Sequence, residues 1–100
     1  MLKVRGGRAI KRIVEDTLKR DLDTIRVVNI LVRSDVDRDG DPVLLIEVIF
    51  DGIPKDINVR NLSAAVRHIR PKLAKIGETA FPLISFISKA EAGRALRGAA

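Results

Sequence analysis

The chain has 100 residues and a formal net charge of +6, which suits one domain with a modest single core. It has no cysteine and one histidine, which excludes a disulfide framework, a cysteine-based zinc site and a cysteine nucleophile, and argues against a multi-histidine metal site or a Ser-His-Asp triad in one chain. No apolar run approaches the roughly 20 residues that span a bilayer, and no secretory signal opens the chain, so we expect a cytosolic protein without a cofactor.

Charge is unevenly distributed along the chain. Residues 1–20 carry a net charge of +5, residues 21–53 carry −5 and residues 54–100 carry +6. Basic flanks around an acidic middle suggest an acidic partner. Apolar residues make up 46% of the chain and aromatic ones 3%, so we expect an aliphatic core in which Phe50, Phe81 and Phe86 are the largest members.

The first predicted element is an amphipathic helix from Arg8 to about Leu22. Residues 1–7 read as a loose, basic lead-in that ends in two glycines. Glu15 and Lys19 stand four residues apart and form a favourable pair on the helix surface. The apolar stripe of this helix follows helical spacing and consists of Ile10, Ile13, Val14, Leu18 and Leu22.

Two strands, 26–34 and 43–50, are predicted to form a β-hairpin. Burying the even-numbered residues of both arms on one face requires even residues to pair with even ones. A three-residue loop, 38–40, achieves this by matching Ile30 to Val48 and Val32 to Ile46, and it places Gly40 at the left-handed position. The even-numbered apolar residues are Val28, Ile30, Val32, Leu44, Ile46, Val48 and Phe50.

A second helix follows a polar loop at 51–60, with Asn61 as its predicted N-cap and Gly77 as its stop signal. Pro71 lies inside it, so we expect a kink there, or two short helices with Pro71 opening the second. The predicted third strand covers 80–88. A capping-box pattern from Ser88 to Glu91 announces a last helix to about residue 97, followed by a frayed tail at 98–100.

These elements predict one α+β domain with the order α-β-β-α-β-α, a three-stranded sheet and helices packed on one face. One layer of helices leaves the other face of the sheet outward, where an apolar patch rimmed by charge would mark a protein interface. Homodimerisation or capture of a different protein would cover this face; the last helix folding over it is the alternative. Arg33 and Glu47 lie diagonally on this face and are a candidate pair. The predicted interface residues are Val27, Leu31, Val43, Leu45 and Ile49.

Basic residues on the first two helices form a second candidate surface, for nucleic-acid phosphates or an acidic partner. Aromatic platforms for stacking bases are missing, since the chain has no Trp or Tyr. The helix-strand-strand-helix-helix-strand layout is similar to the type II KH domain, which implies RNA binding, although the position of its Gly-x-x-Gly clamp reads His68-Ile69-Arg70-Pro71. The residues of this basic surface are Arg8, Lys11, Arg12, Arg60, Arg67, His68, Arg70, Lys72 and Lys75.

The hairpin loop is acidic, and its aspartates Asp35, Asp37, Asp39 and Asp41 are weak candidates for cation binding. The first three, followed by Gly40, match the opening of a calcium-binding loop, but the position of its closing bidentate glutamate is Ile46. A solvated hairpin tip rich in turn-forming Asp is the simpler interpretation.

The stretch Ser34-Asp35-Val36-Asp37 also resembles the signature of minimal bacterial nucleotidyltransferases. That resemblance implies that Asp35 and Asp37 hold magnesium, with Glu47 or Asp51 as third acid, but the family's upstream Gly-Ser pair is absent.

His68 has no carboxylate at helical spacing and reads as a surface histidine. The preferred interpretation is therefore a small non-catalytic binding protein, of the kind represented by bacterial antitoxins or assembly factors. The alternatives are a KH-like RNA binder and a metal-dependent phosphotransfer enzyme.

Overall fold

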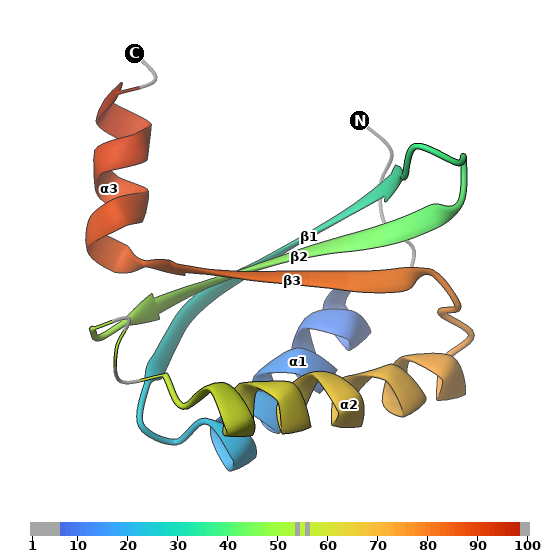
Figure 1. Cartoon of the computed structure of the whole chain (residues 1–100), viewed down its shortest axis with the longest axis horizontal. Coiled ribbons are helices and arrows are strands. Elements are labelled where there is room, and N and C mark those ends of the chain that lie inside the picture. The colour runs from blue at the N-terminus through green and yellow to red at the C-terminus, as the bar shows by residue number, and fades with distance from the viewer. Residues whose placement is uncertain (1–6, 54, 56, 99–100) are drawn as a thin grey trace.

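The computed structural model describes residues 7–53, 55 and 57–98, and it confirms the predicted α+β order (Figure 1). Strand β2 is central, antiparallel to β1 on one side and parallel to β3 on the other. Most of the predicted lead-in and tail lies outside the described residues; Gly7 is the first residue of the first helix and Gly98 the last of the third. The elements are α1 (Gly7–Asp21), β1 (Arg26–Val36), β2 (Pro42–Asp51), α2 (Val59–Lys75), β3 (Phe81–Ser88) and α3 (Lys89–Gly98).

The hairpin forms in the predicted register. Ile30 pairs with Val48 and Val32 with Ile46. The Asp37 N–H donates to the Asp41 carbonyl at 2.9 Å, which closes a three-residue loop, and Gly40 has φ +82°. The loop length therefore sets which side chains of the two strands turn inward.

The prediction that Val28 faces the core is wrong. A bulge interrupts the ladder between Val27, which pairs with Phe50, and Asn29, which pairs with Ile49. The extra residue leaves Val28 49% exposed, while Val27 packs against the core. One unpaired residue shifts the inward–outward alternation of the strand. On the side of the bulge away from the hairpin loop, the odd-numbered Val27 therefore turns inward instead of the even-numbered Val28.

Helix α2 begins one turn earlier than predicted, because its N-cap is Asn58 rather than Asn61. The Asn58 Oδ1 accepts the N–H groups of Arg60 at 2.9 Å and Asn61 at 3.2 Å. The flanking pair Ile57 and Leu62 packs on the core, in the positions of a hydrophobic staple.

The helix runs through Pro71 without a break, so the alternative of two short helices does not form (Figure 1). It ends as predicted at Gly77, where φ is +83° and the N–H groups of Gly77 and Glu78 donate to the carbonyls of Ala74 and Leu73.

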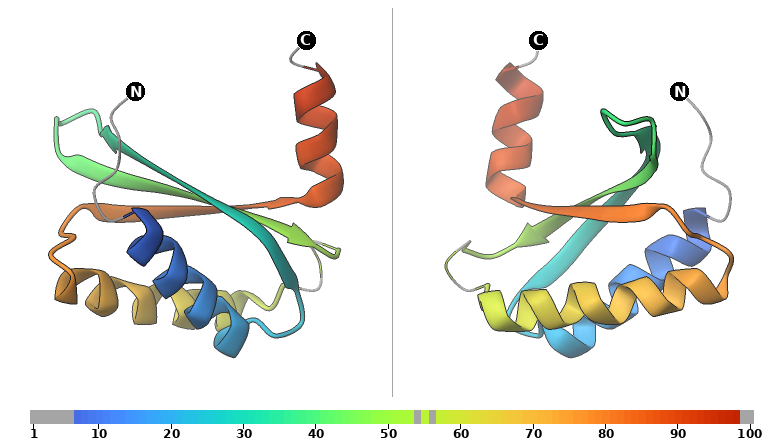
Figure 2. Two further views of the ribbon diagram at one scale, coloured as in Figure 1. Left: turned by 180° about the vertical axis from the view of Figure 1, so that it is seen from behind. Right: turned by 45° about the vertical axis from the view of Figure 1, so that its right-hand side comes forward.

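The core lies between one face of the sheet and the helices α1 and α2, which both cover that face (Figures 1 and 2). Its fully buried members are aliphatic apart from Phe50; they include Val14 and Leu18 of α1, Ile69 of α2 and Val48 of β2. Phe81 does not join them, since it is 48% exposed.

Helix α3 stands on the opposite side of the sheet from α1 and α2. It rises from the end of β3 rather than lying flat over the sheet (Figure 2). The Glu91 N–H donates to the Ser88 Oγ at 3.2 Å, which confirms the predicted cap. Among the described residues no helix is long and apolar enough to cross a membrane.

Candidate interaction surfaces

The outer face of the sheet, defined as the face opposite α1 and α2, exposes apolar side chains of both edge strands. Leu31 of β1 is 42% exposed and Leu83 of β3 is 46% exposed, while Leu45 and Ile49 of the central strand are half-buried. A shallow depression of about 680 Å³ borders this face and reaches round to Lys11 of α1. Its lining combines the outward residues Leu31, Arg33, Leu45, Glu47, Leu83 and Ser85 with Val32, Ile46 and Ile84, which belong to the inward register.

Two of the five predicted interface residues lie elsewhere or are covered. Val27 packs against the core because the bulge at Val28 turns it inward. Val43 stays outside the core cluster but is only 6% exposed. Leu31, Leu45 and Ile49 remain on the outer face, and Leu83 joins them there.

Arg33 and Glu47 occupy adjacent rows of this face. Arg33 pairs with Leu45 across the ladder, and Glu47 pairs with Leu31. Among the described side chains, no ion pair within 4.0 Å includes either residue. Both charges are therefore available to a partner.

The basic residues of the two helices do not form one continuous surface. On α1, Arg12 pairs with Asp16 at 4.0 Å and Lys19 with Glu15 at 3.1 Å, the latter as predicted. Lys11 lines the depression beside β1, together with Arg33. Arg8 and Lys75 are exposed.

On α2, the basic side chains point in several directions. Arg60 and Arg67 line a second shallow depression near the start of the helix, together with Ser63. Arg70 lies over the ring of Phe81, 4.8 Å from its centroid. His68 and Lys72 turn toward α1 instead, so they are engaged within the protein.

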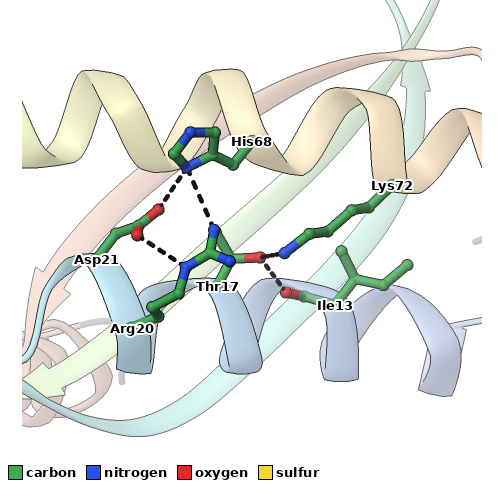
Figure 3. Close-up of polar contacts among 6 residues, drawn as sticks. All are labelled: Ile13, Thr17, Arg20, Asp21, His68 and Lys72. Atoms are coloured by element: carbon green, nitrogen blue, oxygen red, sulfur yellow. Dashed lines mark hydrogen bonds and ion pairs between the residues drawn. The ribbon is translucent and has the colours of Figure 1, made fainter.

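A polar cluster joins α1 to α2 beside the core (Figure 3). The Lys72 ammonium donates to the hydroxyl of Thr17 at 3.0 Å, and this hydroxyl donates to the Ile13 carbonyl at 2.8 Å. Thr17 is fully buried, and its hydroxyl is satisfied both as a donor and as an acceptor.

The second part of the cluster is a contact between His68 and Asp21 that the sequence did not reveal. The His68 Nδ1 lies 2.8 Å from the Asp21 Oδ2 (Figure 3). An ionised carboxylate only accepts, so Nδ1 carries the proton, and the Arg20 guanidinium, 3.3 Å away, cannot donate to the same nitrogen. Hydrogen bonds from His68 and Arg20 lower the pKa of Asp21, whose side chain is 13% exposed.

Three aspartates of the hairpin loop come together, but Asp35 is not among them. The carboxylates of Asp37, Asp39 and Asp41 are exposed and place oxygens within 4.8 Å of one another. The Asp37 Oδ1 accepts the N–H groups of Asp39 and Asp41, each at 2.9 Å, so it shapes the turn. The Asp35 Oδ1 accepts the N–H of Val36.

The third carboxylates suggested by the nucleotidyltransferase resemblance lie away from this loop. Glu47 pairs with Leu31 in the middle of the ladder, and Asp51 pairs with Arg26 at its far end. The described metal-capable cluster contains neither residue. The cluster at the tip is consistent with a solvated turn.

The KH-like layout fails at its functional position. In that resemblance the clamp would fall in a break between two helices, whereas α2 is continuous across residues 68–71. Comparison with protein-family models, with curated proteins and with solved structures finds no match to this chain.

Proposed function

We propose that the chain is a non-catalytic binding protein whose contact surface for another protein, or for a second copy of itself, is the outer face of the sheet. One observation carries this proposal: Leu31 and Leu83, on the two edge strands, are 42% and 46% exposed on the face that α1 and α2 leave uncovered. Large side chains gathered on one exposed face mark an interaction site more reliably than scattered ones.

The charges beside these leucines suit the same role. Arg33 and Glu47 flank the depression without an ion pair of their own among the described residues. A partner that buries the leucines and matches one or both charges gains affinity from the apolar area and orientation from the charges. An antitoxin-like or assembly-factor-like role would use such a contact.

The test is a double substitution on the outer face, Leu31→Glu with Leu83→Glu. Self-association is measured by light scattering, and partner binding by quantitative capture from the native cell. Placing two carboxylates in the contact should reduce the assembled or captured fraction about tenfold or more.

The matched control replaces two exposed apolar residues outside this face, Val59→Glu with Ile76→Glu; these are 74% and 47% exposed. The control should assemble and capture as the unmodified chain does. Equal behaviour of the two double variants would remove the outer face as the contact surface.

A further inference from the structure

The two edges of the sheet are protected to different degrees. The β1 edge has a bulge at Val28, and its strand carries the charged residues Arg26, Arg33 and Asp35. Bulges and charges are the usual devices that prevent another strand from pairing with an edge. β1 is therefore a poor template for strand addition.

The β3 edge lacks these devices. Its strand reads Phe-Pro-Leu-Ile-Ser-Phe-Ile-Ser and contains no charged residue. Pro82, near its start, is the one residue of the strand that disfavours pairing, because proline has no backbone N–H. β3 pairs on one side with β2, and among the described residues no backbone hydrogen bond of a turn, loop or cap uses its other side. Alternate residues of β3 thus present N–H and C=O groups outward to solvent, and an extended backbone is the partner whose own N–H and C=O groups match the repeat of this row.

Positive charge lies directly beside this edge. The Arg70 guanidinium is 4.8 Å from the centroid of the Phe81 ring, which places it at the first residue of β3. Arg67 stands one helical turn earlier on α2 and is exposed, and it lines the depression near the start of that helix with Arg60. Among the described residues, no ion pair within 4.0 Å includes any of the three arginines.

We propose that β3 accepts an extended acidic segment of another protein as a fourth strand. The backbone of this segment pairs with β3. Its side chains alternate between the two faces, so an acidic residue on the helical side of the sheet meets Arg70 beside Phe81, and the intervening apolar residues extend the outer face beside Leu83.

The same charges select against two other occupants. A second copy paired antiparallel through β3 would set Phe81 toward the far end of the partner strand, and β3 holds no acidic residue that could meet Arg70. An RNA strand could neutralise these arginines, but it has no alternating N–H and C=O groups for the β3 backbone.

The test is an NMR titration of the full chain with a synthetic peptide in which glutamate and valine alternate. Binding should shift the backbone amides of residues 83–87 and slow their hydrogen exchange. N-methylation of every peptide residue should abolish binding, because it removes the N–H donors from both hydrogen-bonding edges of the peptide. Arg70→Glu should weaken binding about tenfold, whereas Arg8→Glu, the same charge change on α1, should leave it unaltered.

Several outcomes would overturn the proposal. These are no binding at millimolar peptide, equal binding of the N-methylated peptide, shifts confined to Leu31 and Leu45, or an oligouridine that perturbs the β3 amides with the same dependence on Arg70. The single variant Leu31→Glu, on the opposite edge strand, separates the two surfaces, because it should weaken the outer-face contact and leave peptide binding at β3 unaltered. Failure of the peptide titration leaves the outer-face contact standing.

Discussion

The contact between His68 and Asp21 fixes the end of α1 against the middle of α2. A carboxylate at the last residue of a helix is disfavoured by the helix dipole, so Asp21 depends on the donors that surround it. His68 donates from α2 at 2.8 Å and the Arg20 Nε donates at 3.1 Å. These hydrogen bonds stabilise the ionised form and hold the pKa of Asp21 below its ordinary value.

Stability should therefore depend on the ionisation of Asp21. Its folded pKa lies below the ordinary value of 3.8, so the carboxylate stabilises the fold fully above that value, and this contribution disappears as the pH falls through the folded pKa. Asp21→Asn should lower the free energy of unfolding by about 1 kcal/mol at pH 7, since His68 is half exposed. Urea unfolding from pH 7 down to pH 3 should show this difference shrinking below about pH 4.

The matched control is Asp16→Asn on the same helix. The Asp16 side chain is 66% exposed and its one ion pair, with Arg12, measures 4.0 Å, so the change should be within about 0.5 kcal/mol at every pH. A difference for Asp21→Asn that stays constant from pH 7 to pH 3 would contradict the assignment.

No local pattern in the sequence could have revealed this pair. His68 and Asp21 are 47 residues apart, and the sequence offers His68 only non-acidic neighbours at helical spacing. Their meeting depends on how α1 and α2 lie side by side on the sheet. Spacing rules describe neighbours on one element and say nothing of the angle between two.

At the scale of single elements, two glycines should respond oppositely to the same substitution. Gly77 has φ +83° in the turn that ends α2, and no atom lies within 4 Å of an added Cβ, so the cost of Gly77→Ala is purely conformational. We expect a loss of about 1 kcal/mol in the free energy of unfolding. Gly93 lies inside α3, where alanine favours the helix, so Gly93→Ala should leave stability unchanged or raise it by up to about 1 kcal/mol.

Thermal and urea unfolding of the two variants measure these changes. Gly77→Asn is the control, because asparagine tolerates the left-handed region and should recover part of the loss. An equal loss for Gly77→Asn and Gly77→Ala would argue that something other than the backbone angle sets the cost.

The elements themselves follow from local signals to different degrees. The hairpin register is predictable because two signals indicate the same three-residue loop: the even-numbered apolar residues of both strands must share one face, and a glycine stands where the loop needs a positive φ. The bulge at Val28 is not, since Val27 and Val28 are identical side chains and either could turn inward. The Asn58 cap does carry a signal in the sequence: Ile57 before it and Leu62 after it form a hydrophobic staple, whereas Asn61 lacks such a flanking pair.

For the whole molecule, the core cluster predicts that α3 is dispensable for folding. The buried members of this cluster come from α1, α2, the strands and the turn after α1, and none is among residues 89–93, the part of α3 whose side chains the structure describes. Removing residues 89–100 should leave a cooperative unfolding transition, with a loss of no more than about 2 kcal/mol, because the buried core lies between the sheet and the helices α1 and α2. Circular dichroism melting of the shortened chain measures this, and a non-cooperative transition would contradict it.

The placement of charge over the molecule was the least predictable property of the candidate sites. The sequence grouped nine residues into one basic surface, while the structure turns His68 and Lys72 toward α1, Arg70 toward β3 and Lys11 toward β1. Long side chains reach whichever neighbour the tertiary arrangement offers, and helical spacing does not determine that neighbour.

The parallel pairing of β3 with β2 has a consequence for how the chain is made. β2 can pair with β1 as soon as the three-residue loop and both strands are available. Its second edge stays unpaired until α2 and then β3 have been synthesised. At about 5–20 residues per second, the 37 positions from Asp51 to Ser88 take roughly 2–7 seconds to synthesise. During that interval the nascent chain exposes one edge of β2, the strand that will later lie at the centre of the sheet. Pairing of this edge with a wrong strand is therefore expected mainly before β3 has been synthesised.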